Sequence, residues 1–138
     1  MKKMHREQAI KTIKKDLNKY PELQDACLAI VEYLCAQPEQ NLRHITFGAL
    51  SRAAKLDHIK DVIPASRYLT GARVPILNLE FEFIEDDLIE PIPREQVSEA
   101  RESGVFYHPV SGDQVENFEN MLVMYFELSK DGLELRQN

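Results

Sequence analysis

No stretch of this sequence is apolar enough over about 20 residues to cross a lipid bilayer as a helix. The N-terminal segment MKKMHREQAIKTIKK is basic, but the apolar run of a secretory signal does not follow it. We therefore expect a protein without membrane contact that works in the cytoplasm.

Cysteine is also scarce, and both thiols, Cys27 and Cys35, lie in one predicted helix. Their spacing of eight residues is about 12 Å along a helix axis, at 1.5 Å per residue. A disulfide requires Cα atoms less than about 7 Å apart, so we expect two reduced thiols in a helical core. Neither a CxxC pair nor a histidine with a partner at metal-ligand spacing occurs, which predicts no metal and no cofactor.

The motifs of common enzymes are missing as well. The five glycines do not cluster into a phosphate-binding loop, and no Walker A, GxGxxG or GxSxG motif is present. The densest polar group is YHPVSGDQVE, which includes His108, Ser111 and Asp113. Members of a catalytic triad normally converge from separate elements, whereas Pro109, Ser111 and Gly112 are typical of a turn. The sequence therefore predicts a protein that is not an enzyme.

The chain does have the length of a single domain and an uneven distribution of charge. We expect one domain over 1–138, with an N-terminal helical segment (1–42), a helix pair followed by a hairpin (43–92) and a C-terminal extension (93–138). The net charge of −6 divides into +1 over 1–42, +4 over 43–79 and −11 over 80–138. This asymmetry predicts one surface that tolerates anions and another that repels them, or an acidic half that only aids solubility.

Apolar spacing predicts helices over 5–19 and 21–36, the second starting at Pro21. Thr46 is the expected N-cap of a third helix that runs to about Lys55. Pro64 is tolerated if Asp61 caps a fourth helix over 62–70 and 57–61 form a turn or a short helical piece. We expect Gly71 to end that helix in a left-handed conformation.

Alternating apolar residues predict a strand over 77–83, and the acidic turn EDD leads into a second strand over 88–92. A short helix is expected from Pro93 to Ser103, followed by two extended pieces around Ser111-Gly112. The segment 118–128 fits a helix or a strand, and we favour a strand that returns through SKDG into another strand over 133–135.

This order of elements resembles the winged-helix branch of helix-turn-helix domains over about residues 21–92. The resemblance rests on ITFGALSRAAKLD as positioning helix and turn, DVIPASRYLTG as recognition helix, and PILNLEFEFIEDDLIEPI as wing. It implies an α+β fold with a winged-helix-like core of three to four helices, a β-hairpin wing and a β-rich C-terminal extension.

The resemblance also implies contact with double-stranded DNA, because a recognition helix presents polar side chains to base edges while basic residues hold phosphates. Arg67 is the best candidate to read a base, since its planar guanidinium can bind guanine through two hydrogen bonds. The candidate nucleic-acid-binding residues are Arg52, Lys55, Lys60, Ser66, Arg67, Tyr68 and Arg73.

The predicted wing is acidic, which favours a different kind of partner. Glu85, Asp86 and Asp87 form its tip, and carboxylates there would be repelled by phosphates within a Debye length of roughly 8 Å. They are therefore candidate protein-interaction residues. The sequence leaves two hypotheses open: a small non-catalytic regulatory protein that binds nucleic acid, and an acidic protein-interaction module, an adaptor or a complex subunit, without nucleic-acid contact.

Overall fold

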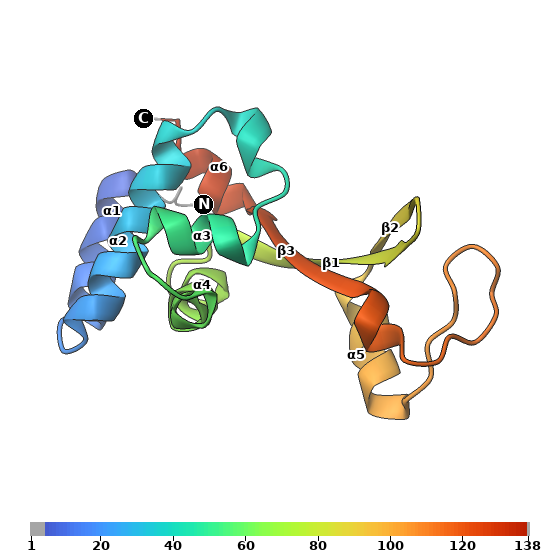
Figure 1. Ribbon diagram of the computed structural model, residues 1–138. Coiled ribbons are helices and arrows are strands. Elements are labelled where there is room, and N and C mark those ends of the chain that lie inside the picture. Colours follow the sequence, from blue (N-terminus) through green and yellow to red (C-terminus); the bar gives the residue numbers. More distant parts are fainter. Residues whose placement is uncertain (1–4, 138) are drawn as a thin grey trace. The chain divides into compact units, whose positions relative to one another are not determined.

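The computed structural model describes residues 5–137, which gather into two compact units (Figure 1). The first, called here the helical unit, combines residues up to Asn78 with those from Phe126 onward. The second spans Leu79–Tyr125 and is called the acidic unit. The structure mixes helices with a three-stranded sheet and is therefore α+β. A single domain over 1–138 stays a prediction.

The helical unit is built around α2, which packs against α1, α3 and α4. Its apolar stripe is fully inaccessible at Cys27, Ile30 and Leu34, as the periodicity predicts. Cys35, on the same helix, is only partly buried, and both cysteines are free thiols. The helices of this unit are α1 (Arg6–Asp16), α2 (Pro21–Ala36), η1 (Glu39–Leu42), α3 (Phe47–Ala53), η2 (Ile59–Val62), α4 (Ile63–Thr70) and α6 (Lys130–Leu135).

The residues at which α3 and α4 begin reflect capping hydrogen bonds and the position of a proline. The Thr46 Oγ1 accepts a hydrogen bond from the N–H of Ala49 at 3.0 Å, which confirms the predicted N-cap. Pro64 lies in the first turn of α4, where its missing N–H costs no helical hydrogen bond. The expected cap at Asp61 is wrong, because the short helix η2 runs directly into α4 and Val62 takes the capping position.

Gly71 does end α4, but the expected left-handed conformation is wrong. Its φ of −84° and ψ of −172° are extended, because the chain leaves the helix directly toward the sheet. A Cβ at this position would lie 3.2 Å from the carbonyl oxygen of Arg67. The glycine thus provides space beside the last turn of the helix and does not serve as a left-handed stop.

The sheet has the strand order β2-β1-β3, with β1 at Leu77–Glu85, β2 at Leu88–Ile92 and β3 at Leu122–Leu128. The predicted hairpin is confirmed, since β1 and β2 pair antiparallel with Glu85 opposite Leu88 and Phe81 opposite Ile92. Phe81 and Phe83 are buried, as their alternation with glutamates predicts.

The acidic unit has its own hydrophobic core, formed by the hairpin, α5 (Arg94–Ser103) and the chain that follows it. The rings of Phe83, Phe106 and Phe118 are stacked, with successive centroids 5.6 and 5.3 Å apart. The predicted helix after Pro93 is confirmed, and it ends at Gly104, whose φ of 79° is in the left-handed region. The buried members of this core are Phe81, Phe83, Ile92, Val97, Ala100, Phe106 and Phe118.

The C-terminal extension is only partly β-structured. The strand favoured for 118–128 is confirmed over Leu122–Leu128, after the short helix η3 (Phe118–Met121). The expected strand over 133–135 is wrong, because these residues belong to α6. The Ser129 Oγ accepts from the N–H of Gly132 at 3.0 Å and donates to the carbonyl of Pro75 at 2.5 Å. It thereby caps a helix where SKDG suggested a hairpin loop.

Candidate functional site

The turn after α3 places Lys55 in a left-handed conformation, with a φ of 59°. The N–H of Lys55 donates to the carbonyl of Arg52 at 3.1 Å, and the N–H of Leu56 donates to that of Ser51 at 3.0 Å. These bonds form a Schellman motif, in which glycine is the usual left-handed residue. A lysine is therefore held here against its conformational preference, with its side chain exposed.

Four of the seven predicted nucleic-acid-binding side chains are exposed on this helix pair and its turn. They make no hydrogen bond or ion pair to another side chain or carbonyl within residues 5–137. The four are Arg52 at the end of α3, Lys55 in the turn, Lys60 in η2 and Arg67 in α4. They remain available for an anionic partner.

The other three predicted residues are engaged inside the helical unit. Ser66 is only 5% exposed, and its hydroxyl donates to the carbonyl of Ile63 at 2.8 Å, so its expected outward orientation is wrong. The Tyr68 hydroxyl donates to Asp16 Oδ2 at 2.7 Å. Arg73 donates to both oxygens of the same carboxylate, at 2.9 and 3.1 Å. Tyr68 and Arg73 therefore connect α4 and the segment after it to α1.

The hydrogen bonds among Asp16, Tyr68 and Arg73 shift the pKa values of the Asp16 carboxyl and the Tyr68 phenol. Hydrogen bonds from Arg73 first, and then from Tyr68, hold the pKa of Asp16 below its usual range. Burial, followed by the hydrogen bond to Asp16, raises the pKa of the Tyr68 phenol. The carboxylate is consequently ionised and the phenol protonated across the physiological range.

The surroundings of Lys60 weaken its value as a phosphate contact. It lines a surface hollow of about 400 Å³ together with Glu22, Asp61 and Pro64. Two carboxylates at the same hollow offset one ammonium group. Arg52, Lys55 and Arg67 are therefore the stronger candidates for contact with an anionic partner.

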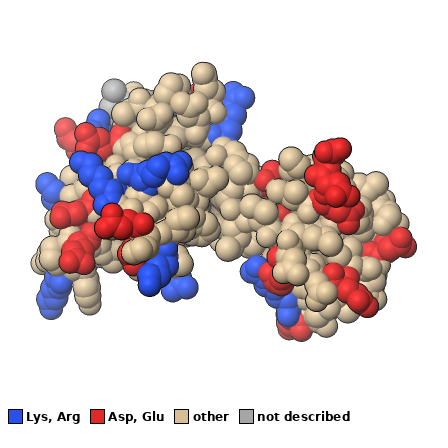
Figure 2. All heavy atoms as spheres, in the orientation of Figure 1, with Lys and Arg blue, Asp and Glu red and all other residues tan. Residues whose placement is uncertain are grey.

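The two units differ in charge. The acidic unit contains twelve Asp and Glu but only two Arg and no Lys, a net charge of −10, and the rest of the chain carries +4. In Figure 2, the charged side chains on the visible face of the acidic unit are mostly acidic, whereas acidic and basic side chains are interspersed over the helical unit. No continuous basic face is visible in this view.

Arg101, one of the two arginines, is occupied within the acidic unit. It donates to both carboxylate oxygens of Glu119, at 2.7 and 3.1 Å, and its guanidinium lies 5.3 Å from the centroid of the Phe81 ring. This pairing lowers the pKa of Glu119. Arg101 therefore serves the packing of α5 on the hairpin and η3.

The predicted protein-interaction residues form the tip of the hairpin. Asp86 and Asp87 are exposed, and Asp86 is in the left-handed region with a φ of 51°, which aspartate tolerates better than most residues. Glu85 accepts from the Nε2 of His108 at 3.0 Å. The acidic tip is thus joined to the loop over 108–113.

The Ser–His–Asp group of this loop lies in a hydrogen-bonded turn, as its turn residues predict. The Nδ1 of His108 accepts from the N–H groups of Val110 and Ser111, both at 3.1 Å. The Ser111 Oγ accepts from the N–H of Asp113 at 3.3 Å. Both nitrogens of the imidazole are therefore engaged, with Glu85 on one side and with the two N–H groups on the other.

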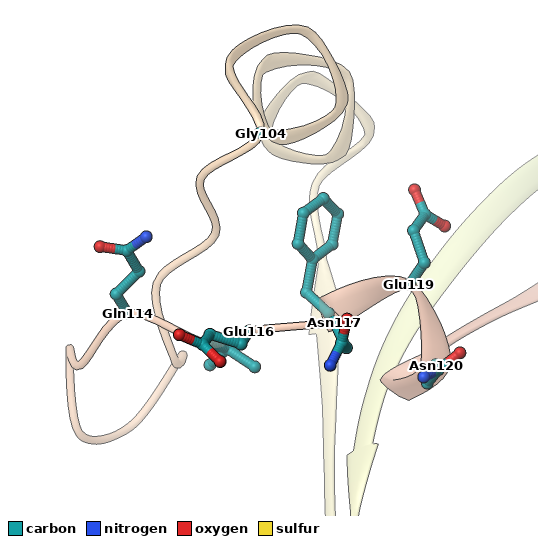
Figure 3. A pocket seen from close by; sticks show the side chains of 8 residues that line it. Gly104, Gln114, Glu116, Asn117, Glu119 and Asn120 are labelled. Atoms are coloured by element: carbon teal, nitrogen blue, oxygen red, sulfur yellow. The ribbon is translucent and has the colours of Figure 1, made fainter.

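A hollow of about 500 Å³ also lies within the acidic unit, between the end of α5 and the segment 114–120. Figure 3 shows Glu119 extending toward the side where Gly104 lies. Its lining is made of amides, carboxylates and apolar groups, and contains no cysteine, serine, histidine or lysine. The lining residues are Gly104, Gln114, Val115, Glu116, Asn117, Phe118, Glu119 and Asn120.

Exposed apolar side chains are concentrated in the acidic unit. Five of the eight large exposed hydrophobic residues of the described chain belong to it, although it holds 47 of the 138 residues. Sequence patterning does not show that these residues are exposed, because alternation places a residue on a face without showing whether another element covers it. The five are Ile89, Tyr107, Val110, Val123 and Met124.

Within residues 5–137, no group of three or more His, Cys, Asp or Glu side chains is placed to hold a metal ion. None of the helices in that range is long and apolar enough to cross a membrane. No family model, curated protein or solved structure matches the chain.

Proposed function

We propose that this protein is a small non-catalytic interaction module, an adaptor or complex subunit whose acidic unit binds a basic, amphipathic segment of a protein partner. The observation that carries the proposal is the coincidence of exposed apolar side chains with a net charge of −10 in one compact unit. Exposed apolar surface favours association because binding removes it from water. The surrounding carboxylates select partners of opposite charge.

The non-catalytic part of the proposal is supported by the use that the unit makes of its reactive side chains. Both ring nitrogens of His108 are hydrogen-bonded, Nε2 to Glu85 and Nδ1 to two backbone N–H groups. A general base needs a free nitrogen within hydrogen-bond reach of the proton that it removes. In this arrangement the imidazole holds a loop in place.

The proposal can be tested with a fluorescent, amphipathic 15-residue peptide made of leucine and lysine. The peptide is titrated with the whole protein, and its binding is followed by fluorescence anisotropy. We expect saturable binding that weakens with salt, because the screening length falls from about 10 Å at 0.1 M to about 3 Å at 1 M. A variant that removes the three charges of the hairpin tip should bind about tenfold more weakly, at roughly 0.5 kcal/mol per exposed charge. That variant is Glu85→Gln, Asp86→Asn, Asp87→Asn.

The amides are chosen because glutamine can still accept the bond from His108, and asparagine tolerates the left-handed conformation of Asp86. The matched control changes the net charge equally on the helical unit, at three exposed positions of α2. It is Glu22→Gln, Asp25→Asn, Glu32→Gln. Equal weakening in both variants, or no binding by the wild-type protein, would contradict the proposal.

A second candidate function is binding of double-stranded DNA by the helical unit, through a helix-turn-helix of the winged-helix kind. It is favoured by the exposed Arg52, Lys55 and Arg67 on one helix pair, whose side chains have no partner within the part of the chain that the structure describes. It is also favoured by the contacts of α2 with both α3 and α4. In this function the acidic hairpin would stay away from the phosphates.

Duplex binding measured by anisotropy over a salt series tests the second candidate. Neutralising phosphates releases counterions, so the affinity should fall steeply with salt, and each lost contact should reduce the slope by about one. Arg52→Gln and Arg67→Gln should each do so, whereas Lys14→Gln, an exposed lysine on α1, should not. Absence of duplex binding at low salt would eliminate this candidate.

A further inference from the structure

The β1–β2 hairpin has two unlike faces. Phe81 and Phe83 point into the core of the acidic unit, so the intervening residues of β1 point to the opposite side. We call that side the outer face. On it, Ile84 is paired with Ile89 across the strands, and Glu82 is paired with Pro91.

The third strand adds an apolar residue to the same face. Leu122 packs against the core of the acidic unit, so the next residue, Val123, points outward from β3 by the alternation of a strand. β1 lies between β2 and β3 in the sheet. Isoleucine and valine side chains from all three strands therefore share the outer face.

The inner and outer faces of the β1–β2 hairpin differ in coverage, whereas on β3 the same alternation places Met124, which is 41% exposed, on the inner side. Val97 and Ala100 of α5 are buried against the inner face. On the outer face, Ile89 is 57% exposed and Val123 is 39% exposed. The solvent face of an antiparallel sheet is normally polar, and exposed apolar residues gathered on one face are typical of a surface that a partner covers.

We propose that the outer face of this sheet is the docking surface for a basic amphipathic segment of a protein partner; the inference deepens the proposed function and depends on it. The apolar side of the segment would lie on Ile84, Ile89 and Val123. Its lysine or arginine side chains would reach Glu80, which the period of two places on the same face of β1 as Ile84.

The charge of the acidic unit determines which kind of partner suits the outer face. The unit carries a net charge of −10, so two copies of the face would repel each other, and a nucleic acid would be repelled by the same carboxylates. A basic segment gains attraction at the rim and removes apolar surface from water at the centre. Its chemistry is therefore complementary to the face in both respects.

The test uses the leucine–lysine peptide with the variant Ile89→Thr, Val123→Thr. Threonine keeps the β-branched shape that strands favour and removes apolar surface, so we expect an intact fold. Binding should weaken about tenfold or more, since each lost buried methylene corresponds to about a fourfold loss of affinity. The matched control, Val110→Thr, changes an exposed residue of the loop, 67% accessible, and should bind as the wild type does.

A second measurement does not depend on any substitution. Amide chemical shifts of the wild-type protein, recorded during the titration, should move along residues 80–84, 88–90 and 122–125. Shift changes confined to the loop over 108–113, or an equal loss in Val110→Thr, would overturn the docking surface while the proposed function stands. Absence of peptide binding by the wild-type protein would contradict the proposed function itself.

Sedimentation tests the remaining alternative, in which a second copy of the chain covers the outer face. A wild-type protein that is a dimer without peptide, and a monomer in the Ile89→Thr, Val123→Thr variant, would overturn the inference in favour of a second copy of the chain. A monomer in both cases, with peptide binding lost only in the variant, supports a basic segment as the occupant.

Discussion

His108 and Glu85, 23 positions apart in the chain, meet at 3.0 Å between Nε2 and Oε1. Because the Nδ1 of the same ring accepts two backbone N–H groups, the hydrogen bonds specify the neutral tautomer with its proton on Nε2. One side chain thus fastens the loop over 108–113 to the tip of the hairpin. The ring also packs edge-on against Phe83, with centroids 5.0 Å apart.

This arrangement predicts different effects for two amide substitutions. In His108→Asn the shorter amide can still accept near the position of Nδ1, whereas in His108→Gln it reaches toward Glu85 and leaves the Val110 and Ser111 N–H groups unpaired. We expect fast hydrogen exchange of these two amides in His108→Gln and slower exchange in His108→Asn, measured by NMR. A lost backbone bond of this kind costs about 1 kcal/mol in the free energy of unfolding. Equal exchange in both variants would contradict the prediction.

The contacts of Asp16 predict a stability that depends on pH. Its pKa is depressed in the folded state by Arg73 and Tyr68, so its contribution is present above the pKa of the unfolded chain and is lost as the pH falls through the folded pKa. The difference in thermal midpoint between wild type and Asp16→Asn should therefore be constant near pH 7 and shrink below about pH 4.

Asp25→Asn, an exposed carboxylate on α2, is the control for Asp16→Asn. Near pH 7 it should show a smaller difference than Asp16→Asn does. A difference for Asp16→Asn that persists unchanged at pH 2 would show that the ionised form of Asp16 does not contribute to stability.

Lys55 predicts a stabilising substitution. A non-glycine residue in the left-handed region costs roughly 1 kcal/mol, and glycine avoids that cost. Lys55→Gly should raise the free energy of unfolding by about that amount, whereas Lys55→Ala, which keeps a Cβ, should leave it nearly unchanged. Urea denaturation followed by circular dichroism measures both values. A loss of stability in Lys55→Gly would show that the turn does not need a left-handed residue here.

The two cysteines should differ in reactivity. Burial raises the pKa of Cys27 to about 12, and the reactive species is the thiolate. Cys35 is only partly buried and lies near Arg6 and Arg136, which oppose the rise that its burial causes. Labelling of the native protein with a thiol reagent should therefore modify Cys35 first, and Cys27 only on unfolding. Cys35→Ser should remove the faster phase; if it removed the slower one, the assignment would be reversed.

Several features of the fold follow from neighbouring residues and could be predicted. The cap at Thr46, the placement of Pro64 in the first turn of α4, and the alternation that buries Phe81 and Phe83 each depend on a few adjacent positions. Local chemistry was ambiguous at SKDG, where serine can start a turn or cap a helix. The contact of Ser129 with Pro75, 54 positions away, accompanies the helix.

The candidate surfaces depended more strongly on contacts between distant residues. Ser66 and Tyr68 were expected to face outward with Arg67, yet the first is buried and the second donates to Asp16, 52 positions earlier. The apolar outer face of the sheet could not be foreseen, because Ile89 and Val123 belong to strands that meet only through β1.

The sequence by itself determined the approximate positions of α1 to α5, the β1–β2 hairpin and the favoured strand β3, together with the acidic character of residues 80–138 and the burial of one face of the hairpin. These features follow from propensity, periodicity and charge, which act over a few neighbouring residues. The tertiary structure decided which polar side chains remain exposed and which apolar face lacks a cover. Those outcomes depend on side chains that come together from distant parts of the chain, such as Asp16 with Tyr68 and Arg73, and local patterns contain no record of such contacts.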